Sequence, residues 1–71
     1  MIIKNVEFKD VLNGLITERG VDIDHISINA NISKAKLLKW IAGEGVPKVS
    51  DIIVLSKYFD VSINYLFGLN D

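Results

Sequence analysis

Three lysines lie close together in the segment ISKAKLLKWIAG, residues 32–43, and they offer the clearest binding chemistry in this chain. They are Lys34, Lys36 and Lys39, and Ser33 stands directly before them. Lysine ammonium groups donate hydrogen bonds to phosphate oxygens and to the O6 and N7 atoms of guanine. A serine hydroxyl can cap a helix or donate to a phosphate. The segment therefore predicts a nucleic-acid contact, unless these lysines are only the solvated face of a helix.

Apolar side chains stand beside these lysines, where a nucleic-acid reader would present polar groups. An interface between proteins has an apolar centre and a charged rim, whereas a nucleic-acid reader needs hydrogen-bond donors around its edge. Single exposed apolar residues are ordinary on a protein surface, but a contiguous patch would bind another polypeptide. We therefore predict a partner-binding surface formed by Ile23, Ile28, Ala35, Leu38 and Val46.

The sequence contains no arrangement of residues for catalysis or metal binding. The chain has no cysteine, and its one histidine, His25, lacks a second histidine or cysteine as a co-ligand. No nucleophile is paired with a base, and no glycine-rich loop could hold a phosphate. We expect a protein that is not an enzyme and that uses no metal or other cofactor.

Length and composition predict one small domain. The 71 residues leave no room for a second core, so we expect residues 1–71 to form a single domain with its core at 8–68. The longest apolar run, Ile52–Leu55, is much shorter than the ~20 residues of a membrane span. The N-terminus becomes charged too early for a signal peptide. We expect no membrane contact and a location in the cytoplasm.

The first half of the chain predicts three helices with a sharp turn between the second and the third. Apolar residues at helical spacing over 8–16 define the first helix, and Gly20 closes it. Asp22 is placed to cap a second helix that runs to about residue 30. Asn31 can adopt the left-handed conformation that a sharp exit needs. Ser33 then caps a third helix, which runs to about residue 42.

The second half predicts two more helices. Pro47 marks a loop before the fourth helix, and Ser62 caps a short fifth helix that ends at Gly68. Five helices without a strand make an all-α domain. The fourth helix is expected to bury Val49, Ile52, Ile53, Leu55 and Phe59.

The order of these elements resembles the Cro/C1-type family of phage repressors and bacterial regulators. The resemblance covers about residues 8–68, and the ending YFDVSINYLFG is its most specific part. It implies a five-helix, lambda-repressor-like helix-turn-helix domain whose third helix enters the major groove of DNA. By this resemblance, the base-facing positions are Lys34, Ala35 and Lys39, with Lys36 and Leu38 beside them.

Several positions depart from the family pattern. The second helix usually opens with a glutamine that holds a phosphate, but this chain has Ile23 there. The loop after the third helix is usually basic, whereas here it contains Glu44 and Val46. Each lost phosphate contact removes counterion release and the affinity that comes with it. A buried ion pair of the family is replaced by Ile16 and Ile41, which we interpret as core packing.

Two functions compete on these observations. The first is a regulator that binds the DNA-binding domain of another helix-turn-helix repressor, as small antirepressors and modulators of repression in temperate phages of Gram-positive bacteria do. The alternative is an autonomous Cro-like dimeric repressor that binds operator DNA through its third helix. The net charge of −1 and pI of about 5.7 differ from the pI above ~9 of electrostatically driven nucleic-acid binders. We favour protein binding in a bacterial cytoplasm. Operator DNA is then contacted directly or through the partner, and the chain is a monomer or a homodimer; the sequence does not distinguish these alternatives.

Overall fold

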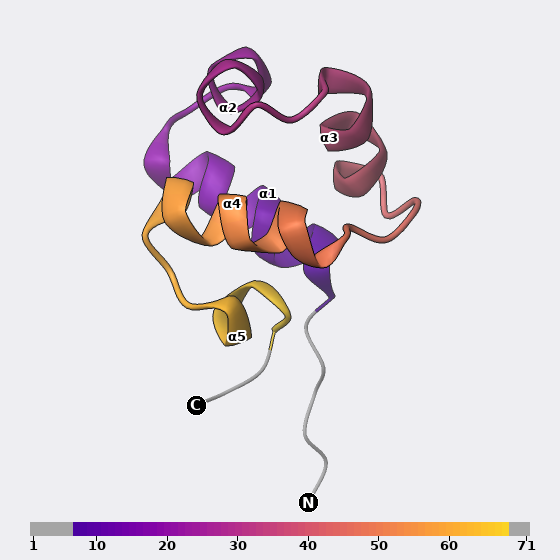
Figure 1. Cartoon of the computed structure of the whole chain (residues 1–71), viewed down its shortest axis with the longest axis vertical. Helices are drawn as coiled ribbons and strands as arrows, with labels where there is room; N and C mark the ends of the chain where they lie inside the picture. The colour runs from indigo at the N-terminus through magenta and orange to yellow at the C-terminus, as the bar shows by residue number, and fades with distance from the viewer. Residues whose placement is uncertain (1–6, 69–71) are drawn as a thin grey trace, which may run out of the picture.

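The computed structural model describes residues 7–68, which form five α-helices and contain no strand. The prediction of an all-α, five-helix fold is confirmed for this part of the chain. None of these helices has the length and apolar character that a membrane crossing requires. In chain order the helices are α1 (Phe8–Arg19), α2 (Ile23–Ala30), α3 (Lys34–Ile41), α4 (Val49–Phe59) and α5 (Ile63–Leu66) (Figure 1).

The helices pack around one apolar core. In Figure 1, α2 and α3 lie at one end of the molecule, α5 lies at the opposite end, and α1 and α4 lie between them. The predicted recognition segment therefore lies at the end of the molecule opposite α5. Ile16 and Ile41 pack against the core as half-buried residues, in agreement with their interpretation as packing residues. The buried side chains of the core are Leu12, Leu15, Ile26, Ala30, Ile32, Leu37, Trp40, Ile52, Leu55, Phe59 and Leu66.

Local polar contacts fix the ends of the helices. Gly20 ends α1 in the left-handed conformation, with φ of 65°, which a residue without Cβ adopts at little cost. Asp60 ends α4 in the same conformation, with φ of 57°. The hydroxyl of Ser62 accepts a hydrogen bond from the backbone N–H of Tyr65 at 3.0 Å and begins α5, as predicted. The helix boundaries thus follow from residues that lie within a few positions of each end.

The structure corrects the prediction for the fourth and fifth helices. The apolar pattern predicts that Val49 and Ile53 are buried, but their exposed fractions are 73% and 39%. They lie one turn apart on a stripe of α4 that flanks the buried stripe formed by Ile52 and Leu55. A helix that packs against its neighbours on one side buries only that side, and apolar residues beyond it stay in contact with solvent. The fifth helix ends at Leu66 rather than at residue 68.

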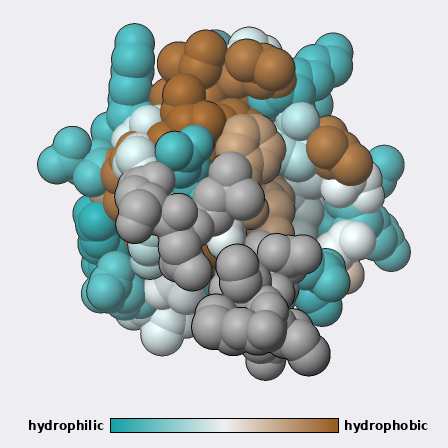
Figure 2. Space-filling model, turned by 90° about the horizontal axis from the view of Figure 1, so that it is seen from below, coloured by the Kyte–Doolittle hydropathy of each residue, from teal (hydrophilic) through white to brown (hydrophobic). Residues whose placement is uncertain are grey.

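Apolar surface is also exposed near the α5 end of the molecule. Ile63, Tyr65 and Phe67 are each between 42% and 47% exposed. Viewed from this end, hydrophobic side chains gather on one side of the face (Figure 2). Exposed apolar residues therefore also occur outside α2 and α3. Those of α4, Val49 and Ile53, can serve as matched controls in a test of the α2–α3 surface.

Candidate recognition surface

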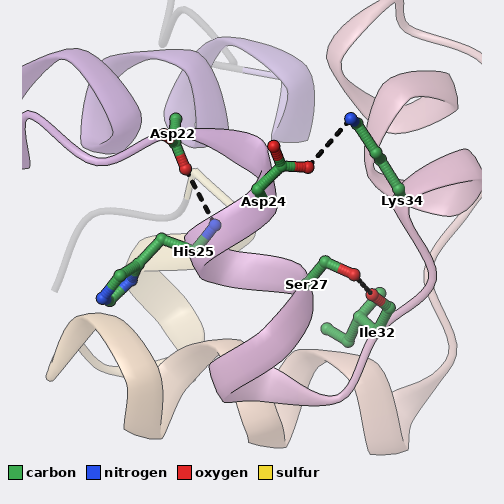
Figure 3. A network of polar contacts seen from close by, with 6 residues as sticks. All are labelled: Asp22, Asp24, His25, Ser27, Ile32 and Lys34. Carbon is green, nitrogen blue, oxygen red and sulfur yellow. Dashed lines mark hydrogen bonds and ion pairs between the residues drawn. The ribbon is translucent and has the colours of Figure 1, made fainter.

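Short hydrogen bonds fix the start of α2 and the turn between α2 and α3. Asp22 caps α2, because its carboxylate accepts the backbone N–H of His25 at 2.8 Å. Asn31 leaves the helix in the left-handed conformation, with φ of 56°. The hydroxyl of Ser27 then donates to the carbonyl oxygen of Ile32 at 2.7 Å, which fixes the chain after the turn (Figure 3). The predictions for Asp22 and Asn31 are confirmed.

Ser33 begins α3 as predicted. Its hydroxyl oxygen accepts the backbone N–H of Lys36 at 3.1 Å, so it satisfies one of the free donors of the first turn. This contact uses the oxygen as an acceptor and leaves the hydroxyl hydrogen able to point outward. Ser33 is therefore a helix cap that retains a donor on an exposed residue.

Lys34 is held by a carboxylate from the preceding helix. Its Nζ lies 2.8 Å from Oδ1 of Asp24, and the two side chains reach toward each other from α3 and α2 (Figure 3). The hydrogen bond and the charge of Asp24 raise the pKa of Lys34 above its ordinary value, and the charge of Asp22 adds to this effect. The predicted base-facing lysine is thus engaged within its own chain while both partners stay largely exposed.

Lys36 and Lys39 border a hollow at the other end of α3. The hollow has a volume of about 190 Å³. Lys36 Nζ lies 3.9 Å from Oδ2 of Asp51, a carboxylate that is only 13% exposed and that also accepts the backbone N–H of Lys48 at 3.1 Å. Lys39 is exposed and forms no ion pair with another residue of 7–68. The hollow is lined by Lys36, Lys39, Trp40, Gly45, Val46, Lys48 and Asp51.

Four of the five predicted partner-binding residues are exposed. Ile28 and Val46 are 79% and 85% exposed, Leu38 is 51% exposed, and Ala35 also faces solvent. Ile23 is less exposed than the other four, because it is half-buried and packs against the core. A residue at the start of α2 that is drawn toward the core can contribute only part of its side chain to an interface.

The ion pair between α2 and α3 indicates how Ile28 and Leu38, the main exposed apolar residues of these helices, lie relative to each other. Ile28 lies four residues after Asp24 on α2, and Leu38 lies four residues after Lys34 on α3. Residues four positions apart share one face of a helix. Ile28 and Leu38 therefore continue the two stripes that Asp24 and Lys34 join, and both stand on the outer side of the helix pair.

Two carboxylates of this surface could not be placed from the sequence pattern. Asp24 and Lys34 are ten positions apart and meet only because α2 packs against α3. Asp51 reaches Lys36 from a different helix, at a separation of fifteen positions. Contacts of this kind depend on the packing of helices, so helical periodicity alone does not reveal them.

His25 contacts α4. Its ring Nδ1 is hydrogen-bonded to the phenol oxygen of Tyr58, and the two rings are 5.8 Å apart between centroids. Over residues 7–68, no three His, Cys, Asp or Glu side chains gather closely enough to hold a metal ion. Within this range, His25 helps to fasten the start of α2 to α4.

The chain is similar to transcriptional regulators of two bacteria, while no protein-family description matches it. It is 28% identical over 63 residues to the HTH-type transcriptional activator BcrR of Enterococcus faecalis, covering 89% of this chain and 31% of that protein. The crystal structure of a transcriptional regulator from Listeria innocua superposes with a TM-score of 0.82 at 26% identity. That match covers 96% of this chain and 64% of the other chain.

These similarities and the geometry of α2 and α3 define the fold. The chain has a helix-turn-helix fold and is similar to these transcriptional regulators. It spans less than a third of the length of BcrR and just under two thirds of the Listeria regulator.

Proposed function

We propose that this domain regulates transcription by binding a partner protein through the outer surface of α2 and α3. The partner that fits this role is the DNA-binding domain of another helix-turn-helix repressor, with the present chain as an antirepressor or modulator of repression in a phage-like genetic switch. The observation that carries the proposal is the exposure of Leu38 and Ala35 in the middle of α3, where a reader of base edges relies mainly on polar side chains and an apolar one can contact only a thymine methyl group.

The charges around this apolar centre support protein as the ligand. Lys34 is paired with Asp24 at 2.8 Å, and Lys36 lies 3.9 Å from Asp51. Phosphate contacts by lysine provide most of the sequence-independent affinity for DNA. Apolar residues with charged residues around them are instead the arrangement of a protein interface.

The position of Ile23 also disfavours a strong DNA contact. It opens α2, where a side chain with a hydrogen-bond donor could reach a phosphate, and it is half-buried against the core instead. The loop after α3 adds the exposed residues Glu44 and Val46. This rim supplies few donors to a duplex, so we expect DNA binding by the lone chain to be weak or to depend on the partner.

Autonomous operator binding is the second candidate, and the similarity to an activator and to a regulator favours it. In this function the chain acts as a Cro-like dimer that places α3 in the major groove. Ser33, Lys34, Lys36 and Lys39 are then the DNA-binding residues. Lys39 is the best placed of them, because within residues 7–68 no carboxylate forms an ion pair with it.

Glutamate substitutions on the outer surface test the proposal. We expect Leu38→Glu and Ile28→Glu to reduce binding to a responsive helix-turn-helix domain by at least roughly tenfold, because a buried, unpaired carboxylate in an interface costs more than about 1.4 kcal/mol. Both positions are exposed, so helicity and the unfolding midpoint should stay near those of the unmodified chain. Binding is measured by titration calorimetry against a panel of bacterial helix-turn-helix domains.

The matched controls are Val49→Glu and Ile53→Glu. These residues are also exposed and apolar, but they lie on α4. They should leave the affinity unchanged. Equal affinity for the α2–α3 variants and the unmodified chain would contradict partner binding through this surface. Sequence-specific, nanomolar binding of the lone chain to DNA would establish the second candidate.

A further inference from the structure

The carboxylate of Asp24 lies beside Lys34, the first lysine of α3, and neither the cap of α2 nor the apolar core requires it. Asp24 contacts Lys34 at 2.8 Å, and the two side chains are 67% and 56% exposed. The cap of α2 is Asp22, so Asp24 is not needed to begin the helix, and it is absent from the core. Its principal contact in the described part of the chain is therefore with Lys34.

The contact between Asp24 and Lys34 affects ligand binding more than it affects the stability of the fold. An exposed ion pair contributes little to the free energy of folding, because water screens both charges. A nucleic-acid phosphate that approached Lys34 would have to displace the carboxylate of Asp24 and would then face its negative charge at close range. The exposed carboxylate of Asp22 lies near enough to affect the same lysine and adds to this repulsion.

We propose that Asp24 is a specificity-determining residue of the α2–α3 surface: its carboxylate withholds the ammonium group of Lys34 from the phosphates of duplex DNA. Asp24 thereby biases the surface against nucleic acid and leaves its apolar centre to a protein. The bias toward protein rests on the proposed function, whereas the withholding of Lys34 concerns DNA alone.

The surroundings of the other α3 lysines are consistent with a specific effect at Lys34. Lys36 lies farther from its carboxylate, at 3.9 Å, and that carboxylate is largely buried in a helix cap. Lys39 has no ion-pair partner among residues 7–68. Asp24 also raises the pKa of Lys34, so the ammonium group of Lys34 keeps its charge at neutral pH. Substitution of Asp24 alone therefore removes the carboxylate that competes with a DNA phosphate for Lys34.

The test uses the full chain with Asp24→Asn, and Asp10→Asn as its control. Asp10 is also an exposed acidic residue in the first turn of a helix, so both variants change the net charge and the helix terminus alike. Binding to a mixed-sequence DNA duplex is followed by fluorescence anisotropy over a range of salt concentrations. The slope of log K against log[salt] becomes more negative by about 0.9 for each additional phosphate that the protein neutralises.

We expect the slope of Asp24→Asn to be steeper than that of Asp10→Asn by about 0.9, with tighter binding at low salt. Adding Lys34→Ala to Asp24→Asn should abolish this difference. Asp24→Ser is a second variant that reports the same effect if the asparagine variant does not fold. An identical slope for the Asp24 and Asp10 variants would overturn the proposal, because the effect would then be one of net charge.

Failure of this proposal can be distinguished from failure of the proposed function. Loss of the Asp24 effect in the DNA titration leaves the glutamate variants of Leu38 and Ile28 as an independent measure of partner binding. Conversely, unchanged partner binding by those variants would refute the interface without altering the slope of the Asp24→Asn variant. The two experiments use different ligands and different residues.

Discussion

The lysines of α3 lie in three different electrostatic surroundings although they fall within six residues. Lys34 touches Asp24, Lys36 lies at the edge of ion-pair distance from Asp51, and Lys39 is exposed without such a partner in the described range. Identical side chains on one helix therefore differ in how readily they can contact a phosphate. This difference allows the lysines to be ranked by experiment.

Alanine substitution of single lysines should show this ranking in DNA binding. Lys39→Ala removes a lysine without an internal partner, so we expect it to reduce the salt slope by about 0.9 and to weaken binding at low salt. Lys36→Ala should have a smaller effect, because Asp51 already offsets part of its charge. Anisotropy titrations on the same duplex measure both. A larger effect of Lys36→Ala than of Lys39→Ala would contradict the ranking.

At the scale of helices, the ends are specified locally and the packing is not. Asp22, Ser33 and Ser62 each accept a backbone N–H three residues ahead, and this short range made the starts of α2, α3 and α5 predictable. The exposure of Val49 and the half-burial of Ile23 depend on which neighbouring helix covers each position. Helical periodicity identifies an apolar stripe but does not show how much of it a neighbour covers.

The cap of α3 provides a stability prediction at this scale. Ser33→Ala removes the acceptor for the N–H of Lys36, so we expect the free energy of unfolding to fall by about 1 kcal/mol. Ser50→Ala is the control, since Ser50 is an exposed residue in the first turn of α4 that is not its cap. Urea unfolding followed by circular dichroism measures both changes. Equal midpoints for the two variants would show that the hydroxyl of Ser33 does not stabilise α3.

At the scale of the whole molecule, α2 makes a polar contact with α3 and another with α4. Each contact includes a group that loses its proton at high pH. The Asp24–Lys34 ion pair joins it to α3, and the contact between His25 and Tyr58 joins it to α4. Burial raises the pKa of Tyr58 above its ordinary value of 10.0, and the nearby charge of Asp22 raises it further. Asp24 raises the pKa of Lys34 above 10.5. Loss of either proton therefore removes a polar contact of α2, whose buried residues Ile26 and Ala30 also pack in the core.

The raised pKa of Tyr58 predicts that the folded state loses stability at high pH, whereas the exposed Lys34 adds little to this loss because water screens its charge. Because each group holds its proton more tightly when folded, the stabilisation is fully present below the unfolded pKa and is lost as pH rises through the folded pKa. The urea midpoint should therefore fall as pH rises above about 10. Tyr58→Phe removes one of the two groups together with its contact to His25. This variant should be less stable at pH 8 by roughly 1 kcal/mol, yet its midpoint should fall less steeply in alkali than that of the unmodified chain. Parallel pH profiles for the two proteins would show that Tyr58 does not contribute to the alkaline loss.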